Sequence, residues 1–213
     1  PEVMQLLLLG KQGYELTGGK VNIAMGAVLQ LWSDAREAAL EDPDSAALPD
    51  MDALRQASAH CSIDDLVLDE QAGTAELCDA ELRIDVGAVA KGFATGLVAA
   101  ALCDARYTDF VISAGGNVWA EGAPPGKDGW TVGVQSPDDS GSLLTTLTLS
   151  DAAAVTSGGY LRHMTVDGVQ YHHIIDPDTL MPSDEALSAT VIYTDSGVAD
   201  ILSTACFMLP QDK

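Results

Sequence analysis

Apolar residues recur at helical spacing in several stretches of the chain and alternate with polar residues in others. The helical spacing predicts an N-terminal helix that ends at the stop signal Thr17-Gly18-Gly19. Asn22 and Ser196 are the candidate N-caps of two further helices. The predicted helices cover residues 2–14, 22–39, 51–60, 88–105 and 196–207.

Strand patterns dominate the second half of the chain. The dipeptide Asp167-Gly168 between two apolar runs is a strong signal for a two-residue hairpin. Because the strands cluster and are largely linked by hairpins, the sequence predicts an α+β fold with mixed or antiparallel sheets and packed helices, as a single domain over residues 1–213. The predicted strands are 66–69, 75–86, 109–113, 118–121, 130–135, 143–149, 152–155, 161–166, 169–175 and 187–194.

Charge and cysteine content exclude several classes of protein. The formal net charge of −22 over 213 residues, with no Lys/Arg cluster, argues against a nucleic-acid partner. The four cysteines show no CxxC spacing, which argues against zinc and against a disulfide framework, although one disulfide is left open. Cys103 and Cys206 lie in apolar helical contexts and are expected in the core. The apolar run at residues 4–9 is too short to span a membrane.

Residues 85–92, Asp-Val-Gly-Ala-Val-Ala-Lys-Gly, connect a predicted strand to an alanine-rich helix. Such a turn leaves unpaired backbone N–H groups at the positive end of the helix dipole, where a phosphate is favoured. Lys91 adds a formal positive charge to this first turn and is one of only ten basic residues. The segment therefore indicates an anion site, although the order of its lysine and glycine does not match a Walker loop.

Asp200 and Thr204 are four residues apart and project from one face of the last predicted helix. A carboxylate and a hydroxyl on one face form half of a magnesium site, because Mg²⁺ takes one or two carboxylates and fills its other positions with neutral oxygens, waters and phosphates. The alternative is a solvated aspartate and a threonine bonded back to its own helix.

Glycine-rich segments and a histidine pair provide further candidates. Residues 156–159, Thr-Ser-Gly-Gly, permit a close approach of the backbone to a ligand or form an ordinary turn. Residues 114–117, Ala-Gly-Gly-Asn, indicate a bulge or a close contact between backbone and ligand. His172 and His173 should face opposite sides of a strand, and His173 is either an acid–base group or a structural histidine.

Taken in order, these segments resemble the FAD:protein FMN transferase (ApbE) family of flavin transferases, over nearly the whole chain. The matching segments are Thr17-Gly18-Gly19 with the helix that ends in Leu31-Trp32, residues 85–92, Ser113-Ala114-Gly115-Gly116-Asn117-Val118, Ala154-Val155-Thr156-Ser157-Gly158, His173-Ile174-Ile175-Asp176-Pro177, and Ala199-Asp200 with Ser203-Thr204-Ala205.

The resemblance implies an enzyme that uses Mg²⁺ to transfer the FMN part of FAD to a Ser/Thr hydroxyl of a target flavoprotein, with release of AMP. It implies that the carbonyl of Ala88, the carboxylate of Asp200 and the hydroxyl of Thr204 bind the metal. His173 would orient or deprotonate the incoming hydroxyl, which makes His173 and Asp200 the catalytic candidates. The implied contacts to FAD are Lys91, Gly116, Asn117, Thr156, Ser157, Gly158 and His173.

Departures from the family pattern leave other functions open. Asn22 replaces an aspartate, Gly96 an acidic residue, and Leu180 a glycine. An FAD pyrophosphatase that releases FMN and AMP, a non-catalytic FAD-binding module and an acidic structural domain are the alternatives. Relatives also carry a segment that precedes Pro1, and they are often exported or membrane-anchored. The acceptor protein, the compartment of this chain and its oligomeric state stay open.

Overall fold

The computed structural model describes residues 1–138, 141–160 and 162–210. The chain divides into two compact units, one made of Pro1–Val86 with Gly159–Asp184 and the other of Gly87–Gly158 with the segment from Glu185 onward. Helices and antiparallel sheets occur together, so the predicted α+β class is confirmed.

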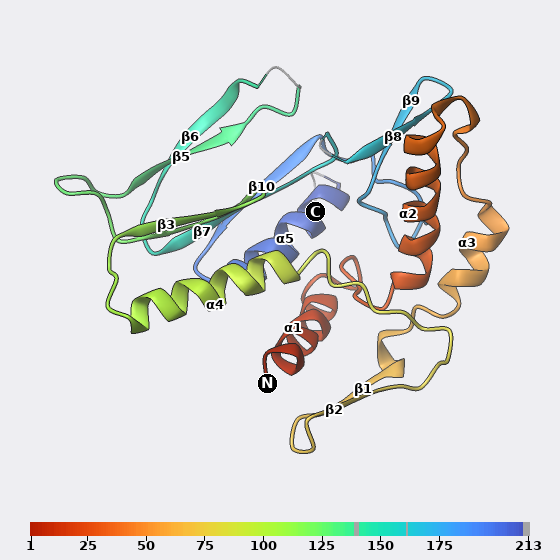
Figure 1. The fold of residues 1–213 in the computed structure, drawn as a ribbon, viewed down its shortest axis with the longest axis horizontal. Coiled ribbons are helices and arrows are strands. Elements are labelled where there is room, and N and C mark those ends of the chain that lie inside the picture. The colour runs from red at the N-terminus through yellow and green to blue at the C-terminus, as the bar shows by residue number, and fades with distance from the viewer. Residues whose placement is uncertain (139–140, 161, 211–213) are drawn as a thin grey trace. The chain divides into compact units, whose positions relative to one another are not determined.

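An antiparallel sheet forms the centre of the second unit, with strands in the order β10-β7-β4-β3 (Figure 1). Its register is defined by pairs such as Val191 with Val155 and Asn117 with Val155. A separate hairpin, β5–β6, has a register shift between Val134 and Gln135. The strands are β3 (Phe110–Ala114), β4 (Asn117–Glu121), β5 (Trp130–Gln135), β6 (Leu143–Leu149), β7 (Ala152–Gly158) and β10 (Ser188–Tyr193).

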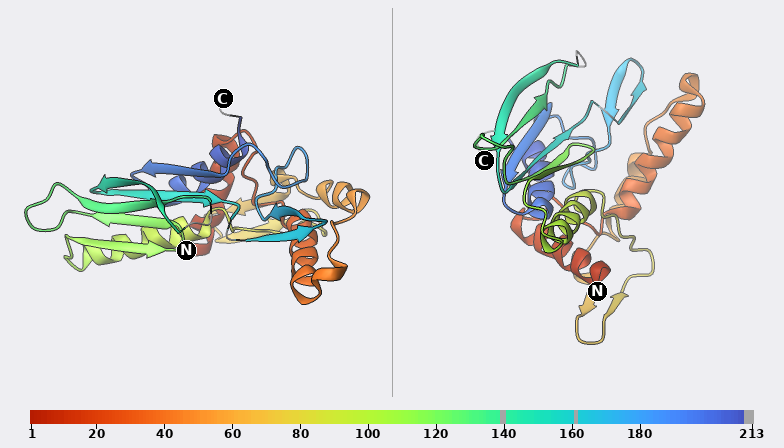
Figure 2. Two further views of the ribbon diagram at one scale, coloured as in Figure 1. Left: turned by 90° about the horizontal axis from the view of Figure 1, so that it is seen from above. Right: turned by 60° about the vertical axis from the view of Figure 1, so that its left-hand side comes forward.

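The two faces of this sheet bury different partners. On one face Ala153 and Val155 of β7 pack against Ala199 of helix α5 (Ser196–Met208), and α4 (Ala90–Asp104) packs on β3 and β4. Figures 1 and 2 show α5 beside β10 in every view. On the other face Ala154 clusters with Ala120 of β4 and with Leu149 of β6. Alternate residues of β7 therefore face opposite layers, as the period of a strand requires.

Helices α4 and α5 approach each other closely at Gly92. A Cβ atom at Gly92 would lie 2.7 Å from Cβ of Asp200 and 2.9 Å from Cα of Gly197, and would also meet the carbonyl oxygen of Ser196. Real Cβ contacts are not that short, so only glycine permits this distance between the helices. Gly96, one turn further along α4, has no atom within 4 Å of the same hypothetical Cβ.

The first unit is organised around helix α2, and its core joins Val28 and Trp32 of α2 to Leu54 of α3 and to Leu180. The Trp32 indole Nε1 donates a 3.0 Å hydrogen bond to the Leu180 carbonyl. The Trp32 ring stacks on the Tyr171 ring, with 6.3 Å between the ring centroids. The elements are α1 (Glu2–Leu16), α2 (Gly26–Glu41), η1 (Pro43–Ser45), α3 (Met51–Ser58), η2 (Ile63–Asp65), β1 (Leu66–Asp69), β2 (Thr74–Leu77), β8 (His163–Val166) and β9 (Val169–His172).

Leu180 has a positive φ of 60°, a backbone conformation that favours glycine. The family resemblance stated above implies glycine at this position. Its side chain is 8% exposed within the α2 core, so burial of the leucine offsets the backbone strain.

Three predictions for the first unit are wrong. The predicted strand over residues 75–86 ends at Leu77, and the segment before α4 is irregular, because Met25 and Arg83 form only an isolated parallel bridge. Asn22 does not cap α2, which begins at Gly26; its Oδ1 instead accepts a hydrogen bond from the Ala24 N–H at 2.9 Å. The second histidine of the pair lies beyond β9, which ends at His172.

Several predictions for helix ends, turns and cysteines also need correction. Asp195, not Ser196, caps α5, with its carboxylate accepting from the Val198 N–H at 2.9 Å. Gly115 and Gly116, with φ of 51° and 90°, form a two-residue turn between β3 and β4, not a bulge. Cys103 and Cys206 are exposed rather than buried, and all four cysteines, which lie in the described residues, are free thiols.

The predicted hairpin at Asp167-Gly168 is confirmed, since Val166 pairs with Val169 across it. Its first strand was predicted from Leu161, which lies outside the described residues, and begins at His163. Within the part of the chain that the structure describes, no helix combines the length and the apolar character needed to cross a membrane.

Candidate functional site

A buried carboxylate, Asp200, lies where the N-terminus of α4 meets α5. The Asp200 side chain is 2% exposed. Its Oδ1 accepts a 2.8 Å hydrogen bond from Lys91 Nζ, and its Oδ2 accepts one of 2.8 Å from the backbone N–H of Gly92. Each carboxylate oxygen therefore has one donor and a further lone pair.

The local sequence explains how α4 provides these donors. Helix α4 begins at Ala90, so the Gly92 N–H belongs to the first turn and has no partner within the helix. The positive end of the helix dipole adds to the attraction of an anion. The helix N-terminus that residues 85–92 predict as an anion site contacts the Asp200 carboxylate, and binding of a phosphate there stays a prediction.

Three hydroxyl groups lie beside Asp200. Ser203 Oγ and Thr204 Oγ1 both donate to the Asp200 carbonyl oxygen, at 2.9 and 3.2 Å. Ser157 Oγ, at the end of β7, lies 2.8 Å from Ser203 Oγ and 3.2 Å from Thr204 Oγ1. The hydroxyl hydrogen of Thr204 is thus directed to its own helix, as one alternative predicted, and its oxygen keeps acceptor capacity. The other part of that alternative, a solvated Asp200, is wrong.

The other predicted contacts of this unit lie at the ends of β4 and β7. Asn117 is fully buried, and its Oδ1 accepts a 2.9 Å hydrogen bond from Ser196 Oγ, which ties the start of α5 to the sheet. Gly116 is exposed at the hairpin tip, and its carbonyl accepts from the Thr156 N–H at 2.8 Å. Thr156 Oγ1 also lies 2.9 Å from Thr190 Oγ1 on the neighbouring β10. Gly158, the last residue of β7, is partly buried.

The oxygen donors around Asp200 fit a hard divalent cation. Among the described residues, no group of three or more His, Cys, Asp or Glu side chains is placed to hold a metal ion. Mg²⁺ needs fewer, because one carboxylate, neutral oxygens, waters and phosphate oxygens complete its shell. Asp200 and Thr204 offer a carboxylate and a hydroxyl on adjacent turns of α5, and Ala88 lies in the turn just before α4. The donor set therefore matches Mg²⁺, with Lys91 on the same carboxylate.

His173 belongs to the other unit, and its tautomer follows from its contact. Its Nδ1 lies 3.2 Å from the Arg162 carbonyl oxygen, which only accepts, so Nδ1 carries the hydrogen and Nε2 carries the lone pair. Burial, together with the nearby positive charge of Arg162, lowers the pKa of His173 to about 4. His173 is therefore neutral near pH 7, with an Nε2 that can accept a hydrogen bond.

His172 has a structural environment. Its Nε2 donates to the Ser183 carbonyl at 2.7 Å, and its Nδ1 accepts from the Ile174 N–H at 3.2 Å. Burial lowers the pKa of His172, which favours the neutral ring that these contacts require. The pair thus separates into one histidine with both ring nitrogens engaged and one with Nε2 as an acceptor.

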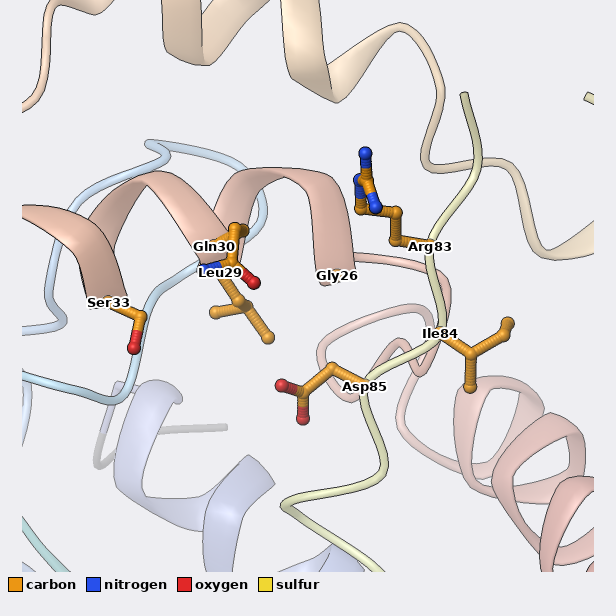
Figure 3. Close-up of a pocket in the computed structure, with 7 residues that line it drawn as sticks. All are labelled: Gly26, Leu29, Gln30, Ser33, Arg83, Ile84 and Asp85. Atoms are coloured by element: carbon orange, nitrogen blue, oxygen red, sulfur yellow. The ribbon is translucent and has the colours of Figure 1, made fainter. Parts of the chain in front are cut away.

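A pocket of about 260 Å³ lies in the first unit, between the start of α2 and residues 83–85 (Figure 3). The Asp85 carboxylate points toward Leu29, whereas the Ile84 side chain points away from it. The pocket is lined by Gly26, Leu29, Gln30, Ser33, Arg83, Ile84 and Asp85. Of these, only Asp85 belongs to a segment that the sequence had indicated as part of a site.

The structure brings together Lys91, Asp200, Thr204 and Ser157, which the sequence had named from separate segments. It adds contacts of Ser203 and of the Gly92 N–H, two groups that the sequence analysis had included in longer segments without a role of their own. Ser203 could have been found from its spacing of three residues from Asp200 on one helix. The contact between Lys91 and Asp200 spans 109 residues and leaves no local signal.

Comparison with known proteins identifies relatives over nearly the whole chain. Residues 1–213 match the model of the ApbE family. The FAD:protein FMN transferase of Treponema pallidum is 34% identical over 93% of this chain and 57% of its own length, and that of Klebsiella pneumoniae is 32% identical over 99% and 63%. The crystal structure of an ApbE protein from Thermotoga maritima superposes with a TM-score of 0.85, at 30% identity over 98% of this chain and 65% of that chain.

The flavin transferase ApbE of Vibrio cholerae superposes with a TM-score of 0.81 at 23% identity, which supports the fold alone. The chain spans about three fifths of the length of the two curated relatives. The match of the family model over residues 1–213 shows that this protein is a member of the ApbE family.

Proposed function

We propose that this protein is an FAD:protein FMN transferase that transfers FMN from FAD to a Ser/Thr hydroxyl of an acceptor flavoprotein and releases AMP. The observation that carries the proposal is the buried Asp200 carboxylate against the N-terminus of α4, with the hydroxyls of Ser203 and Thr204 on the backbone carbonyl of the same residue, in a chain of the ApbE family. The relatives named as FAD:protein FMN transferases support this activity.

Asp200, Thr204 and the Ala88 carbonyl would hold Mg²⁺, whose charge would stabilise the negative charge that develops on the leaving phosphate. Lys91 and the first turn of α4 would bind phosphate oxygens by charge and hydrogen bonding. The acceptor oxygen forms a bond to the phosphorus of the FMN half, the pyrophosphate P–O bond breaks, and AMP leaves. Positioning and charge neutralisation provide most of the catalysis in such a displacement.

His173 would act on the incoming hydroxyl through Nε2, which carries the lone pair. With a pKa of about 4, the ring is a weak base, so it orients the hydroxyl by accepting its hydrogen bond and takes the proton only as the P–O bond forms. The nucleotide site would be lined or supported by residues at the turn before β4, at the start of β4 and at the end of β7: Gly116, Asn117, Thr156, Ser157 and Gly158.

The test is incubation of the protein with FAD and Mg²⁺, with and without an acceptor flavoprotein that carries a Ser/Thr target. Chromatography measures AMP, and mass spectrometry measures the FMN adduct on the acceptor. We expect an adduct and equal amounts of AMP in the wild type, and loss of both in Asp200→Asn, with an unchanged circular dichroism spectrum as the control for folding.

Other outcomes would replace the proposed function. AMP release without an acceptor, at the rate seen with it, would indicate an FAD pyrophosphatase. Tight FAD binding with neither AMP nor adduct under any divalent metal would indicate a binding module. Full activity of a folded Asp200→Asn protein would refute the assignment of Asp200.

A further inference from the structure

The carboxylate assigned to the metal already has a cation on it. Lys91 Nζ lies 2.8 Å from Asp200 Oδ1, and the two side chains differ sharply in exposure, at 46% for Lys91 and 2% for Asp200. A buried carboxylate without a counter-charge is unfavourable, and Lys91 supplies the counter-charge to Asp200.

The two donors to Asp200 differ in how easily they can leave. The Gly92 N–H on Oδ2 belongs to the backbone of α4, where a side chain at Gly92 has no room, so this donor is fixed. The Lys91 ammonium on Oδ1 is at the end of a flexible, half-exposed side chain. Solvent reaches this side chain but hardly reaches the carboxylate, so Oδ1 is the oxygen that an incoming cation can compete for.

A divalent cation and an ammonium group cannot share Oδ1 at contact distance without strong mutual repulsion. Mg²⁺ binds oxygen at about 2.0–2.1 Å and would take the place of Lys91 Nζ, which lies 2.8 Å away. Once displaced, the ammonium remains attached to the first turn of α4, at the end of the helix that favours anions.

We infer that Lys91 is a displaceable counter-ion: it neutralises Asp200 in the metal-free protein, and the arriving metal ion releases it to bind a diphosphate. This inference rests on the proposed function for the identity of the diphosphate, but the displacement itself requires only the metal. Metal and diphosphate then bind in a favoured order, with metal first, because only the metal frees the lysine.

Calorimetric titration with MgCl₂ alone, without FAD, tests the competition. Removal of Lys91 in Lys91→Met should tighten Mg²⁺ binding about tenfold, which corresponds to about 1.4 kcal/mol. Lys91→Gln is the second variant, since its amide can still donate to Asp200 but carries no charge. The gain should persist from 0.1 to 0.5 M NaCl, where distant charges are screened but a contact pair is not. Asp200→Asn should abolish binding.

The ammonium group itself gives a second readout, independent of variants. In the ¹⁵N-labelled wild type, the Lys91 NH₃⁺ signal, assigned by its loss in Lys91→Met, should be visible without metal and shift or broaden when MgCl₂ saturates the site. Inorganic pyrophosphate added to the Mg²⁺-loaded protein should then change it again.

The possible results separate the inference from the proposed function. Mg²⁺ affinity that is unchanged or weaker in both Lys91 variants, an NH₃⁺ signal unaffected by metal, or equal binding by Asp200→Asn would each overturn the displacement. Displacement in a protein that transfers no FMN would leave the inference standing and refute the proposed function. FMN transfer without displacement of Lys91 would support the proposed function and overturn the inference.

Discussion

The contact between α4 and α5 permits a matched pair of glycine substitutions on one helix. Gly92→Ala places a methyl group 2.7 Å from Asp200 Cβ and 2.9 Å from Gly197 Cα. Gly96→Ala places the same group where no atom lies within 4 Å. Both changes replace glycine inside α4 by the best helix former, so they gain the same helix propensity of about 0.5–1 kcal/mol.

The change in the free energy of unfolding should therefore have opposite signs in the two variants. Overpacking at Gly92 costs about 1–3 kcal/mol. Separation of the helices also stretches the Gly92 N–H hydrogen bond to the Asp200 carboxylate, and a hydrogen bond to a charged group contributes about 1.5–3 kcal/mol. We expect Gly92→Ala to lower the free energy of unfolding by about 2–4 kcal/mol and Gly96→Ala to raise it by about 0.5–1 kcal/mol.

Urea denaturation, followed by circular dichroism and by tryptophan fluorescence, measures both free energies under one set of conditions. Trp119, one of three tryptophans, packs in the cluster formed by β7 and α5, so tryptophan fluorescence reports in part on the packing of α5 against the sheet. If Gly92→Ala is as stable as Gly96→Ala, the close approach of the two helices is not what requires glycine, and the reasoning fails. Agreement of the two probes checks that a single transition is measured.

Two further predictions concern a helix cap and a histidine. Asp195→Ala removes the acceptor for the Val198 N–H and should destabilise the protein by about 1 kcal/mol, whereas Asp195→Ser should retain most of the stability. Equal thermal unfolding midpoints for the wild type and Asp195→Ala would contradict the role of Asp195 as the cap. The pKa of His173 falls from about 6.5 in the unfolded chain to about 4 in the folded one. The unfolded state therefore takes up the proton first, and the free energy of unfolding decreases as pH falls through this window, by at most about 3.4 kcal/mol. His173→Gln cannot gain this proton, and its stability should therefore depend less steeply on pH between 4 and 6.5. Identical slopes in urea titrations would rule out a partly buried, neutral His173.

Local periodicity in the sequence determined most of the elements around the site. The strands over residues 130–135 and 143–149 were predicted with their observed bounds, because alternation and turn residues mark strands locally. The shared helix face of Asp200 and Thr204 follows from their spacing alone. The sequence also indicated Lys91 for an anion and His173 as an acid–base candidate. The family resemblance then assigned both to FAD binding, and their roles stay predictions.

Tertiary structure alone decided which groups meet. The strand predicted over residues 75–86 largely fails because this segment pairs with Met25 at a single bridge, and an apolar pattern cannot indicate whether a partner strand is present. Asp195 rather than Ser196 caps α5, since Ser196 is engaged by Asn117 of a distant strand. The pairing of Lys91 with Asp200 depends on the packing of α4 against α5, which no local pattern encodes, because hydrophobic burial fixes faces and distances only when the whole chain has folded.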